Sequence, residues 1–444
     1  MTVSRTICLG FLAVITVGTI LLVMPFSTSS GTWNDPIVAL FTSTSAVCVT
    51  GLGVVDTGTY FSFWGQFFLV ALVQIGGLGY MTATTFLLLL LGAKFGLRDK
   101  VAIQQALDRT GMQGSAQLIR SIVAMTLIFE ITGVLLLLLV FVPDYGFDRG
   151  LWLAIFHSIN SWNNAGFSLF KDNLIGYHSN VLLNLVVSGL IIFGGIGYHV
   201  ILEMYLWLRD RLQRKPEKLI FSLDFKVAIS TTLVLLIAGT VAFLFIEIRN
   251  PETFARLSLG DKLMVAWFQS VTPRTAGFNT IDIGKMTTAG LFLTIAFMFI
   301  GASPGGTGGG IKTTTLRVLT SCTKAIFQGK EEVLLYERKV PVSLILKAVG
   351  VLIGSVATVV ISTILIALTD PEVNFIQIIF EVVSAFATVG LSTGITASVS
   401  GTAKLVLIVI MYVGRVGVLL LMSALLGDPR PSAVHYPEEN LLVG

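Results

Sequence analysis

Apolar segments of two lengths alternate with short polar loops along the chain, and their order repeats four times. Each repeat holds a long apolar segment, a short one of about 14 residues, a small polar loop that ends in glycine, and a second long apolar segment. A helix needs about 20 apolar residues to cross a bilayer, so the long segments can span it and the short ones cannot. The pattern predicts an all-α polytopic membrane protein with eight transmembrane helices and four re-entrant half helices.

These elements define four modules, each made of a helix, a pore-type half helix, a glycine loop and a second helix. The modules cover residues 1–92, 93–208, 209–328 and 329–426, and a tail of residues 427–444 follows. The first spanning helices are expected at 6–25, 116–142, 222–247 and 342–368, the half helices at 34–48, 150–163, 259–272 and 373–386, and the second spanning helices at 62–92, 180–208, 287–327 and 402–426. Four copies of one module imply fourfold pseudo-symmetry about a central axis.

Composition agrees with this arrangement. Hydrophobic residues make up 54% of the chain and charged residues 12%, about half the charge of a soluble domain. The apolar run that follows Arg5 is expected to be a spanning helix, not a signal peptide, because no small-residue cleavage site interrupts it before Pro25. The three cysteines and four histidines have no disulfide or metal-ligand spacing, and no nucleophile–base pair suggests catalytic residues.

The basic residues predict the orientation. They gather in the connections between modules, whereas the connections within modules are mixed or acidic, as at Asp144 and Asp370. The positive-inside rule then places both termini in the cytoplasm and opens the glycine loops to the outside. The net charge of +4 is thus a topology signal, with no nucleic-acid partner expected. The basic residues are Lys94, Arg98, Lys100, Arg109, Arg209, Arg211, Arg214, Lys215, Lys218, Lys324, Lys330, Arg338 and Lys339.

The four glycine loops, residues 48–52, 163–167, 274–278 and 387–391, carry the candidate chemistry. A dehydrated monovalent cation needs a ring of oxygens, and backbone carbonyls supply one without burying charge. Glycine permits the backbone angles this needs, and the absence of paired carboxylates disfavours a calcium site. One such loop would be read as an ordinary turn, but four in the same module position favour a shared ion site. The backbone carbonyls expected to bind such a cation are those of Val49, Thr50, Gly51, Asn164, Ala165, Gly166, Thr275, Ala276, Gly277, Thr388, Val389 and Gly390.

The third loop departs from this pattern. Counted from the aligned polar residues, it is one residue shorter than the second loop. Its register relative to the other three is therefore left open.

A second glycine repeat lies in the second helices, at residues 76–80, 194–198, 305–310 and 414–417. Small residues at this spacing usually allow close helix packing, which is the favoured interpretation of the first two copies. In the third copy, the 301–315 segment contains Pro304 and too many glycines to remain helical, so that helix must break within the bilayer. It is not a phosphate-binding loop, because Ile311 separates Gly310 from Lys312.

Arg415 lies at the centre of an apolar span, where a charge is costly and suggests a functional site. Arg415 could brace the bundle through backbone carbonyls, repel cations below the glycine loops, or do both. The hypothesis is a barrier to cations formed by Arg415 and Lys312 together with Gly305, Gly306, Gly308, Gly309 and Gly310.

Several acidic residues and one charged segment complete the candidates. Glu381 could attract cations or have a structural role, and these two readings are equally weighted. Asp56 and Asp282 follow their glycine loops and could enrich cations at the outer mouth. Residues 328–339 are charged and could form an amphipathic hairpin. Glu130 and Glu203 are further carboxylates at membrane depth or at its interface.

The motifs at 163–168, 269–279 and 302–313 resemble those of the Trk/Ktr/HKT superfamily of potassium-translocating proteins, and most closely those of the membrane subunit of bacterial Ktr systems. The resemblance covers about residues 5–426. It implies a potassium-channel-like fold in which Gly51, Gly166, Gly277 and Gly390 mark a selectivity filter and the 301–315 segment is an intramembrane gating loop. Glycine rather than serine at position 51 implies potassium selectivity.

The resemblance also implies the partners and the activity. The expected function is potassium uptake across the bacterial plasma membrane by a homodimer, with the tail at the dimer interface. A cytosolic ring of the RCK/KTN type (KtrA or KtrC type) would gate it with ATP or ADP bound to that ring alone. No covalent cofactor is expected, and sodium could be an activator. The alternatives are a sodium-coupled potassium symporter or a sodium-permeable relative; a membrane enzyme or purely structural protein is disfavoured.

Overall fold

The computed structural model describes residues 3–79, 115–214 and 220–427. The elements follow the predicted order of first helix, half helix, loop and second helix in each module. Among the described residues, four unbroken helices are each long and apolar enough to span a membrane, and all are first helices of modules. They are α1 (Val3–Val23), α7 (Ser115–Tyr145), α11 (Leu223–Glu247) and α15 (Val342–Thr369).

The half helices are short, as the pattern predicts, and three of them begin at side-chain caps. Asp35 accepts hydrogen bonds from the first turn of its helix, Ser258 does so from Asp261 N, and Asn374 from Ile376 N. The helices are α2 (Pro36–Val47), α8 (Phe147–Trp162), α12 (Leu259–Val271) and α16 (Phe375–Phe386).

The second helices are broken, which corrects the continuous spans predicted for the second and fourth modules. The helix direction bends by 104° between α9 (Val181–Ile196) and α10 (Tyr198–Leu212). It bends by 93° between α17 (Gly401–Val416) and α18 (Val418–Leu426). The third is broken as predicted, into α13 (Thr288–Met298) and α14 (Thr313–Phe327). The first, α4 (Phe63–Leu78), ends just before residue 80, so the rest of the span predicted at 62–92 lies outside the described residues.

The glycines of the second repeat explain both the packing and the breaks. In three copies the first glycine lies against the last residue of the half helix in its own module, where any side chain would collide with a carbonyl oxygen. The last glycine of the same copies has a positive φ, which only glycine adopts freely, and the helix ends there. The pairs are Gly76 with Val47 O, Gly194 with Trp162 O and Gly414 with Phe386 O; the glycines with positive φ are Gly79, Gly197 and Gly417.

A glycine–serine contact attaches the half helix to the first helix in three modules. In the first module the Ser43 hydroxyl donates to Ile15 O at 2.8 Å and packs against Gly18. Ser158 with Gly133 and Ser270 with Gly239 repeat the arrangement, with hydroxyl donation to Glu130 O at 2.7 Å and to Leu236 O at 2.8 Å.

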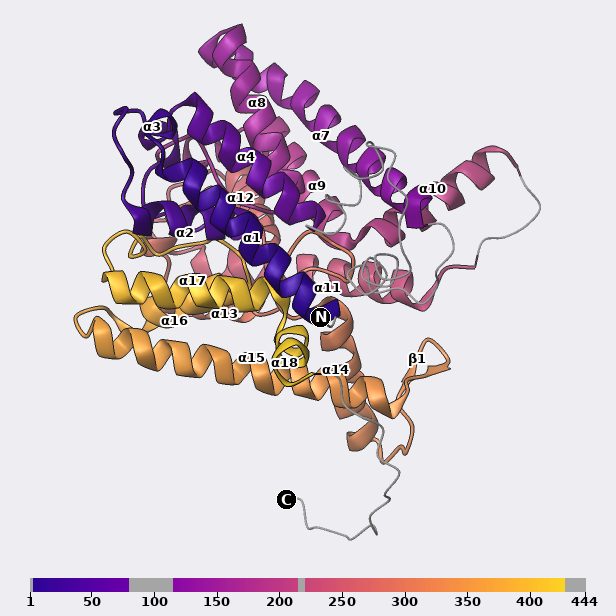
Figure 1. Ribbon diagram of the computed structural model, residues 1–444. Helices are drawn as coiled ribbons and strands as arrows, with labels where there is room; N and C mark the ends of the chain where they lie inside the picture. The colour runs from indigo at the N-terminus through magenta and orange to yellow at the C-terminus, as the bar shows by residue number, and fades with distance from the viewer. Residues whose placement is uncertain (1–2, 80–114, 215–219, 428–444) are drawn as a thin grey trace.

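The first and fourth modules meet and close the bundle. In Figure 1 the indigo helix α1 lies beside the yellow helices α17 and α18. Arg5 Nε donates to Ala424 O at 2.7 Å, and the Tyr412 hydroxyl donates to Cys8 O at 2.9 Å. Segments from opposite ends of the chain are therefore neighbours, as a pseudo-symmetric ring requires.

The charged segment 328–339 forms a hairpin, as predicted. Strands β1 (Leu334–Leu335) and β2 (Arg338–Lys339) pair antiparallel, and Tyr336 and Glu337 both have positive φ at the turn. The Tyr336 hydroxyl lies 2.7 Å from Ser230 Oγ on α11. The predicted connection around residues 93–109 and the tail at 428–444 lie outside the described residues.

Candidate functional site

The four glycine loops share one unusual backbone conformation. In each loop the glycine has a positive φ, and so does the side-chain-bearing residue two positions earlier. Left-handed backbone at a residue with a side chain is uncommon, and four copies at one module position are unlike ordinary turns. The φ values are 57° and 90° for Val49 and Gly51, 58° and 70° for Asn164 and Gly166, 68° and 78° for Thr275 and Gly277, and 51° and 92° for Thr388 and Gly390.

These four glycines form a closed ring, called here the glycine ring. Each lies against the carbonyl of the residue that precedes the glycine of the next module, and the fourth lies against the first. A Cβ atom would lie 2.1 Å from Ala165 O if built on Gly51, 2.7 Å from Ala276 O on Gly166, 2.5 Å from Val389 O on Gly277 and 2.1 Å from Thr50 O on Gly390. The modules therefore surround one axis in chain order, so that the second and fourth are opposite.

The glycine ring opens into a cavity of about 410 Å³, called here the outer cavity because the sequence predicts that the glycine loops face outward. All four glycines line it, and so do Asp56 and Asp282, as the sequence suggested. Each of these two carboxylates also caps a short helix, by accepting from Gly58 N and Gly284 N. The side chains of the residues directly before the glycines are buried, so at the ring itself the backbone carbonyls are the polar groups that could face an ion.

Hydrogen bonds to serines of the half helices hold two of the glycine loops. Gly51 N donates to Ser45 Oγ at 3.0 Å, and Gly390 N donates to Ser384 Oγ at 3.1 Å. Because these serines lie on the half helices, the helices fix the height of the glycine ring. Arg274 of the third loop points away from the axis and donates to Thr232 Oγ1 on α11 at 3.3 Å.

The third loop is one residue shorter than the others, and its register can be assigned. Eight residues separate Ser43 from Gly51 and Ser158 from Gly166, but only seven separate Ser270 from Gly277. A tighter turn absorbs the difference: the residue before the glycine bonds to the carbonyl four residues back in the third loop and five back in the others. Thr275 and Gly277 thus occupy the same positions as their counterparts.

The 301–315 segment lies directly under the third and fourth glycine loops. Gly309 N donates to Thr388 Oγ1 at 3.1 Å. A Cβ on Gly308 would lie 1.9 Å from Thr275 Oγ1, and one on Gly310 would lie 3.3 Å from Ala387 Cβ. The glycines here permit the segment to touch the loops that carry the ring.

The other part of this segment pairs with the break in the second module. Ser303 N donates to Gly195 O at 2.9 Å, and Thr307 N donates to Gly194 O at 3.0 Å. Tyr198 N in turn donates to Gly305 O at 3.2 Å. Carbonyls freed where α9 ends therefore receive donors from the segment, which satisfies backbone groups that lipid could not. Gly305 and Gly306 lie here, apart from the glycine loops.

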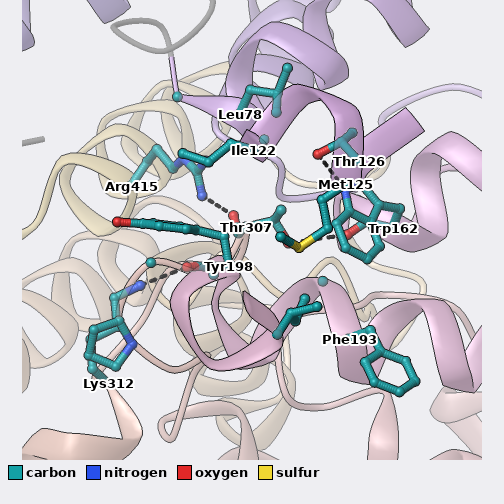
Figure 2. A pocket seen from close by; sticks show the side chains of 18 of the residues that line it. Leu78, Ile122, Met125, Thr126, Trp162, Phe193, Tyr198, Thr307, Lys312 and Arg415 are labelled. Carbon is teal, nitrogen blue, oxygen red and sulfur yellow. Dashed lines mark hydrogen bonds between the residues drawn. The ribbon is translucent and has the colours of Figure 1, made fainter. Parts of the chain in front are cut away.

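Arg415 binds the 301–315 segment from outside, and Lys312 bonds within it, each through a backbone carbonyl (Figure 2). One guanidinium nitrogen of Arg415 donates to Thr307 O and the other to Gly76 O, so Arg415 joins the first, third and fourth modules. Lys312 Nζ donates to Gly308 O at 2.7 Å. Both residues line an inner cavity of about 340 Å³ together with Trp162 and Tyr198.

The remaining carboxylates have different surroundings. Glu381 is buried and bonds to the chain that leaves the fourth glycine loop. Glu130 is buried and accepts from Asn163 Nδ2 at 3.2 Å. Glu203 accepts from Ser222 N at 3.0 Å, at the start of α11. Sequence reasoning missed Thr307 and Gly76 as partners of Arg415, because a pair of backbone carbonyls leaves no side-chain signal.

The chain is similar to known proteins in both sequence and fold. The family model TrkH, described as "Cation transport protein", matches residues 5–429. The "Ktr system potassium uptake protein B" of Bacillus subtilis is 37% identical over 444 residues, covering 100% of this chain and 97% of its own length. The "Potassium/sodium uptake protein NtpJ" of Enterococcus hirae is 38% identical over 445 residues, covering 99% and 97%.

A solved structure shares the fold. The crystal structure of "the Potassium Transporter TrkH from Vibrio parahaemolyticus" aligns with a TM-score of 0.71 and 20% identity. The alignment covers 95% of this chain and 85% of that one. The likeness spans all four modules, so the channel-like fold predicted from the sequence is confirmed.

Proposed function

The chain belongs to the TrkH family of cation transport proteins, and on this premise we propose that it is the ion-translocating subunit of a Ktr-type potassium uptake system. It is a multi-pass membrane transporter and not an enzyme, as predicted. The observation that carries the proposal is the glycine ring, in which each glycine lies against a backbone carbonyl of the next module.

Potassium would shed its water at this ring and bind the carbonyl oxygens of the three residues in each loop that end in Gly51, Gly166, Gly277 and Gly390. Neutral carbonyls bind a cation strongly enough for entry and weakly enough for exit. Asp56 and Asp282 would raise the cation concentration in the outer cavity. The absence of a side chain at all four ring positions supports the preference for potassium that the sequence predicts.

The 301–315 segment would close the path toward the cytoplasm. Its contacts with Thr275 and Thr388 support this role, because a rigid segment there would block the axis just below the ring. Arg415 would hold the segment closed by its bond to Thr307 O, Lys312 would stiffen the segment from within by its bond to Gly308 O, and both charges would repel a cation. Opening then requires these bonds to break or to move together.

Sodium transport or sodium dependence is a second candidate. The name of the Enterococcus hirae relative includes both potassium and sodium, and that protein is as similar to the chain as the potassium protein is. Sodium could activate uptake, be coupled to it, or permeate. Measured uptake with sodium varied separates these cases.

The names of the relatives also support a multi-subunit system in a bacterial cell membrane. The chain would form a homodimer, with both termini in the cytoplasm, and bind a cytosolic ring of the RCK/KTN type that carries ATP or ADP. The basic residues Arg209 and Arg211 at the end of α10 support a cytoplasmic location for that end.

Growth at limiting potassium tests the proposal. An uptake-deficient bacterium would carry the chain alone, or with a cytosolic RCK/KTN-type subunit from the same source. We expect growth at micromolar potassium with the pair and weaker growth with the chain alone. If neither restores growth or rubidium uptake, although the chain is present in the membrane fraction, the proposal fails.

A further inference from the structure

Glu381 is bonded to the chain segment that leaves the fourth glycine loop. Its Oε1 accepts from Thr393 N at 3.0 Å, from the Ser392 hydroxyl and, at the long distance of 3.5 Å, from the Thr393 hydroxyl, and its Oε2 lies 2.8 Å from Thr396 Oγ1. Ser392 is two residues beyond Gly390 and lines the outer cavity with Thr396. Ser384, one turn along the same helix, receives Gly390 N. Helix α16 thus holds the chain on both sides of the ring glycine.

A count of protons indicates the state of this carboxyl. The oxygens of Glu381, Ser392 and Thr396 form three pairs at hydrogen-bond distance, and each pair needs one proton. The two hydroxyls supply only two. The third is present if the carboxyl itself carries a proton, which also suits a side chain only 2% exposed that makes no ion pair within the described residues.

The opposite module has a contact at the same positions. His157, like Glu381, precedes its ring glycine by nine residues, and Ser168, like Ser392, follows it by two. His157 Nε2 lies 3.0 Å from Ser168 Oγ, and Nδ1 lies 2.8 Å from Leu153 O. Since a carbonyl only accepts, Nδ1 carries the proton. Both serines also accept a backbone N–H from two residues further on.

The first and third modules lack this contact. In the first module the residue two positions after the ring glycine is Gly53, which has no side chain. In the third module, whose loop is one residue shorter, the counterpart of Glu381 is Gln269, and it donates toward Met286 Sδ instead. Because the modules surround the axis in chain order, the two contacts act from opposite sides of the ring. This twofold arrangement argues against a contact peculiar to one loop.

We propose that Glu381 is a positioning residue that, as a neutral carboxylic acid, fixes the exit of the fourth glycine loop and so sets the position of the Gly390 carbonyl. It acts through Ser392 and Thr396 and does not touch the ion. The inference rests on the proposed function, because it assigns a residue that shapes the filter.

Glu247 provides a matched control. It is also a fully buried glutamate, but its Oε1 accepts from Thr287 N and the Thr287 hydroxyl, and its Oε2 accepts from Asn250 Nδ2 and the Thr253 hydroxyl. Four donors meet four acceptor positions, so this carboxylate needs no proton. A glutamine, which donates as well as accepts, therefore suits position 381 and not position 247.

The test is rubidium uptake by cells that carry the full chain together with the cytosolic subunit. Two values are measured: the half-saturation concentration and the inhibition by sodium. For Glu381→Gln we expect values within about twofold of wild type, because the amide reproduces one donor and one acceptor. For Glu381→Ala we expect about a tenfold higher half-saturation concentration and stronger sodium inhibition, since at least two hydrogen bonds are lost. Glu247→Gln should lower the amount of folded protein without changing either value in the protein that remains.

Thr396→Val serves if Glu381→Ala does not reach the membrane, because it opens the same ring of oxygens and keeps the carboxyl; a threefold or larger rise in half-saturation concentration is expected. Equal damage by Glu381→Gln and Glu381→Ala would mean that the group acts as an anion, and would overturn the proposal. Wild-type uptake values in Glu381→Ala or Thr396→Val would overturn it as well. Wild-type transport in the same cells separates these failures from failure of the proposed function.

Discussion

The outer and inner halves of this molecule are built on different plans. In the outer half, four loops adopt one backbone conformation, and each contributes a glycine to the same ring. In the inner half, the segment that fills the axis comes from the third module alone, and Arg415, which holds it, comes from the fourth. Under the proposed function the difference has a physical reason: a bound ion is best surrounded by equivalent oxygens from all sides, whereas a path is closed by one obstructing segment and one residue that holds it.

The largest expected effect comes from breaking the outer ring. Gly51→Ala places a Cβ atom 2.1 Å from Ala165 O at a φ of +90°, so the backbone must shift. We expect rubidium uptake to fall by about 100-fold, which corresponds to strain of the order of 3 kcal/mol. Gly31→Ala is the matched control, since Gly31 also has a positive φ (+68°) but has no atom near the added Cβ. Equal losses in the two variants would show that backbone strain, and not the ring, is responsible.

Removing the hydrogen bonds of Arg415 to the backbone should raise ion flux instead of lowering it. Arg415→Ala removes the donors to Thr307 O and Gly76 O and leaves the glycine loops in place. We expect basal rubidium flux without nucleotide activation to rise by at least about tenfold, the loss of one charge-assisted hydrogen bond. Arg317→Ala, an exposed arginine on α14, is the control. Unchanged flux in Arg415→Ala would contradict the role assigned to this residue.

Displacing the inner segment by steric force should have a smaller effect of the same sign. Gly308→Ala places a Cβ atom 1.9 Å from Thr275 Oγ1, which pushes the segment away from the third loop. We expect basal flux to rise about fivefold, because overpacking of this size costs about 1 kcal/mol. Gly189→Ala in α9, where nothing lies within 4 Å of the added atom, should leave flux unchanged. Lower flux in Gly308→Ala would indicate tighter closure and refute this direction.

The smallest effect concerns the equivalence of modules in the outer half. Ser158→Ala and Ser270→Ala each remove one buried hydrogen bond that attaches a half helix to the first helix of its module. Each should lower the free energy of unfolding by about 1 kcal/mol and leave ion selectivity unchanged. Thermal unfolding of the purified protein measures the first, and sodium inhibition of rubidium uptake measures the second. A change of selectivity in only one variant would show that these modules are not equivalent.

The sequence predicted the outer half better than the inner half, for a physical reason. A repeated position reveals itself by spacing, so Gly51, Gly166, Gly277 and Gly390 could be found without a structure. Glycine in a helix has two uses, however, and spacing does not separate them. Gly194 allows close packing against Trp162 O, whereas Gly197, three residues on, turns the helix, and only the packing role was expected.

Contacts with the backbone were equally hidden. The central position of Arg415 in an apolar span predicted a functional role and left its partners open, since carbonyls of any residue could accept its protons. The bond to Gly76 O joins residues 339 positions apart in the chain. The tie between Glu381 and Ser392 likewise depends on side-chain direction, which the pattern of apolar residues does not determine.

The most direct test of the glycine ring is rubidium uptake by the wild type and by Gly277→Ser, with sodium varied and with the cytosolic subunit present. A serine Cβ at position 277 would lie 2.5 Å from Val389 O, which would displace one carbonyl of the ring. We predict that the wild type takes up rubidium and that the variant loses affinity or selectivity against sodium. Identical transport by the two proteins would contradict the account, because the loops would then be turns and not an ion-binding ring.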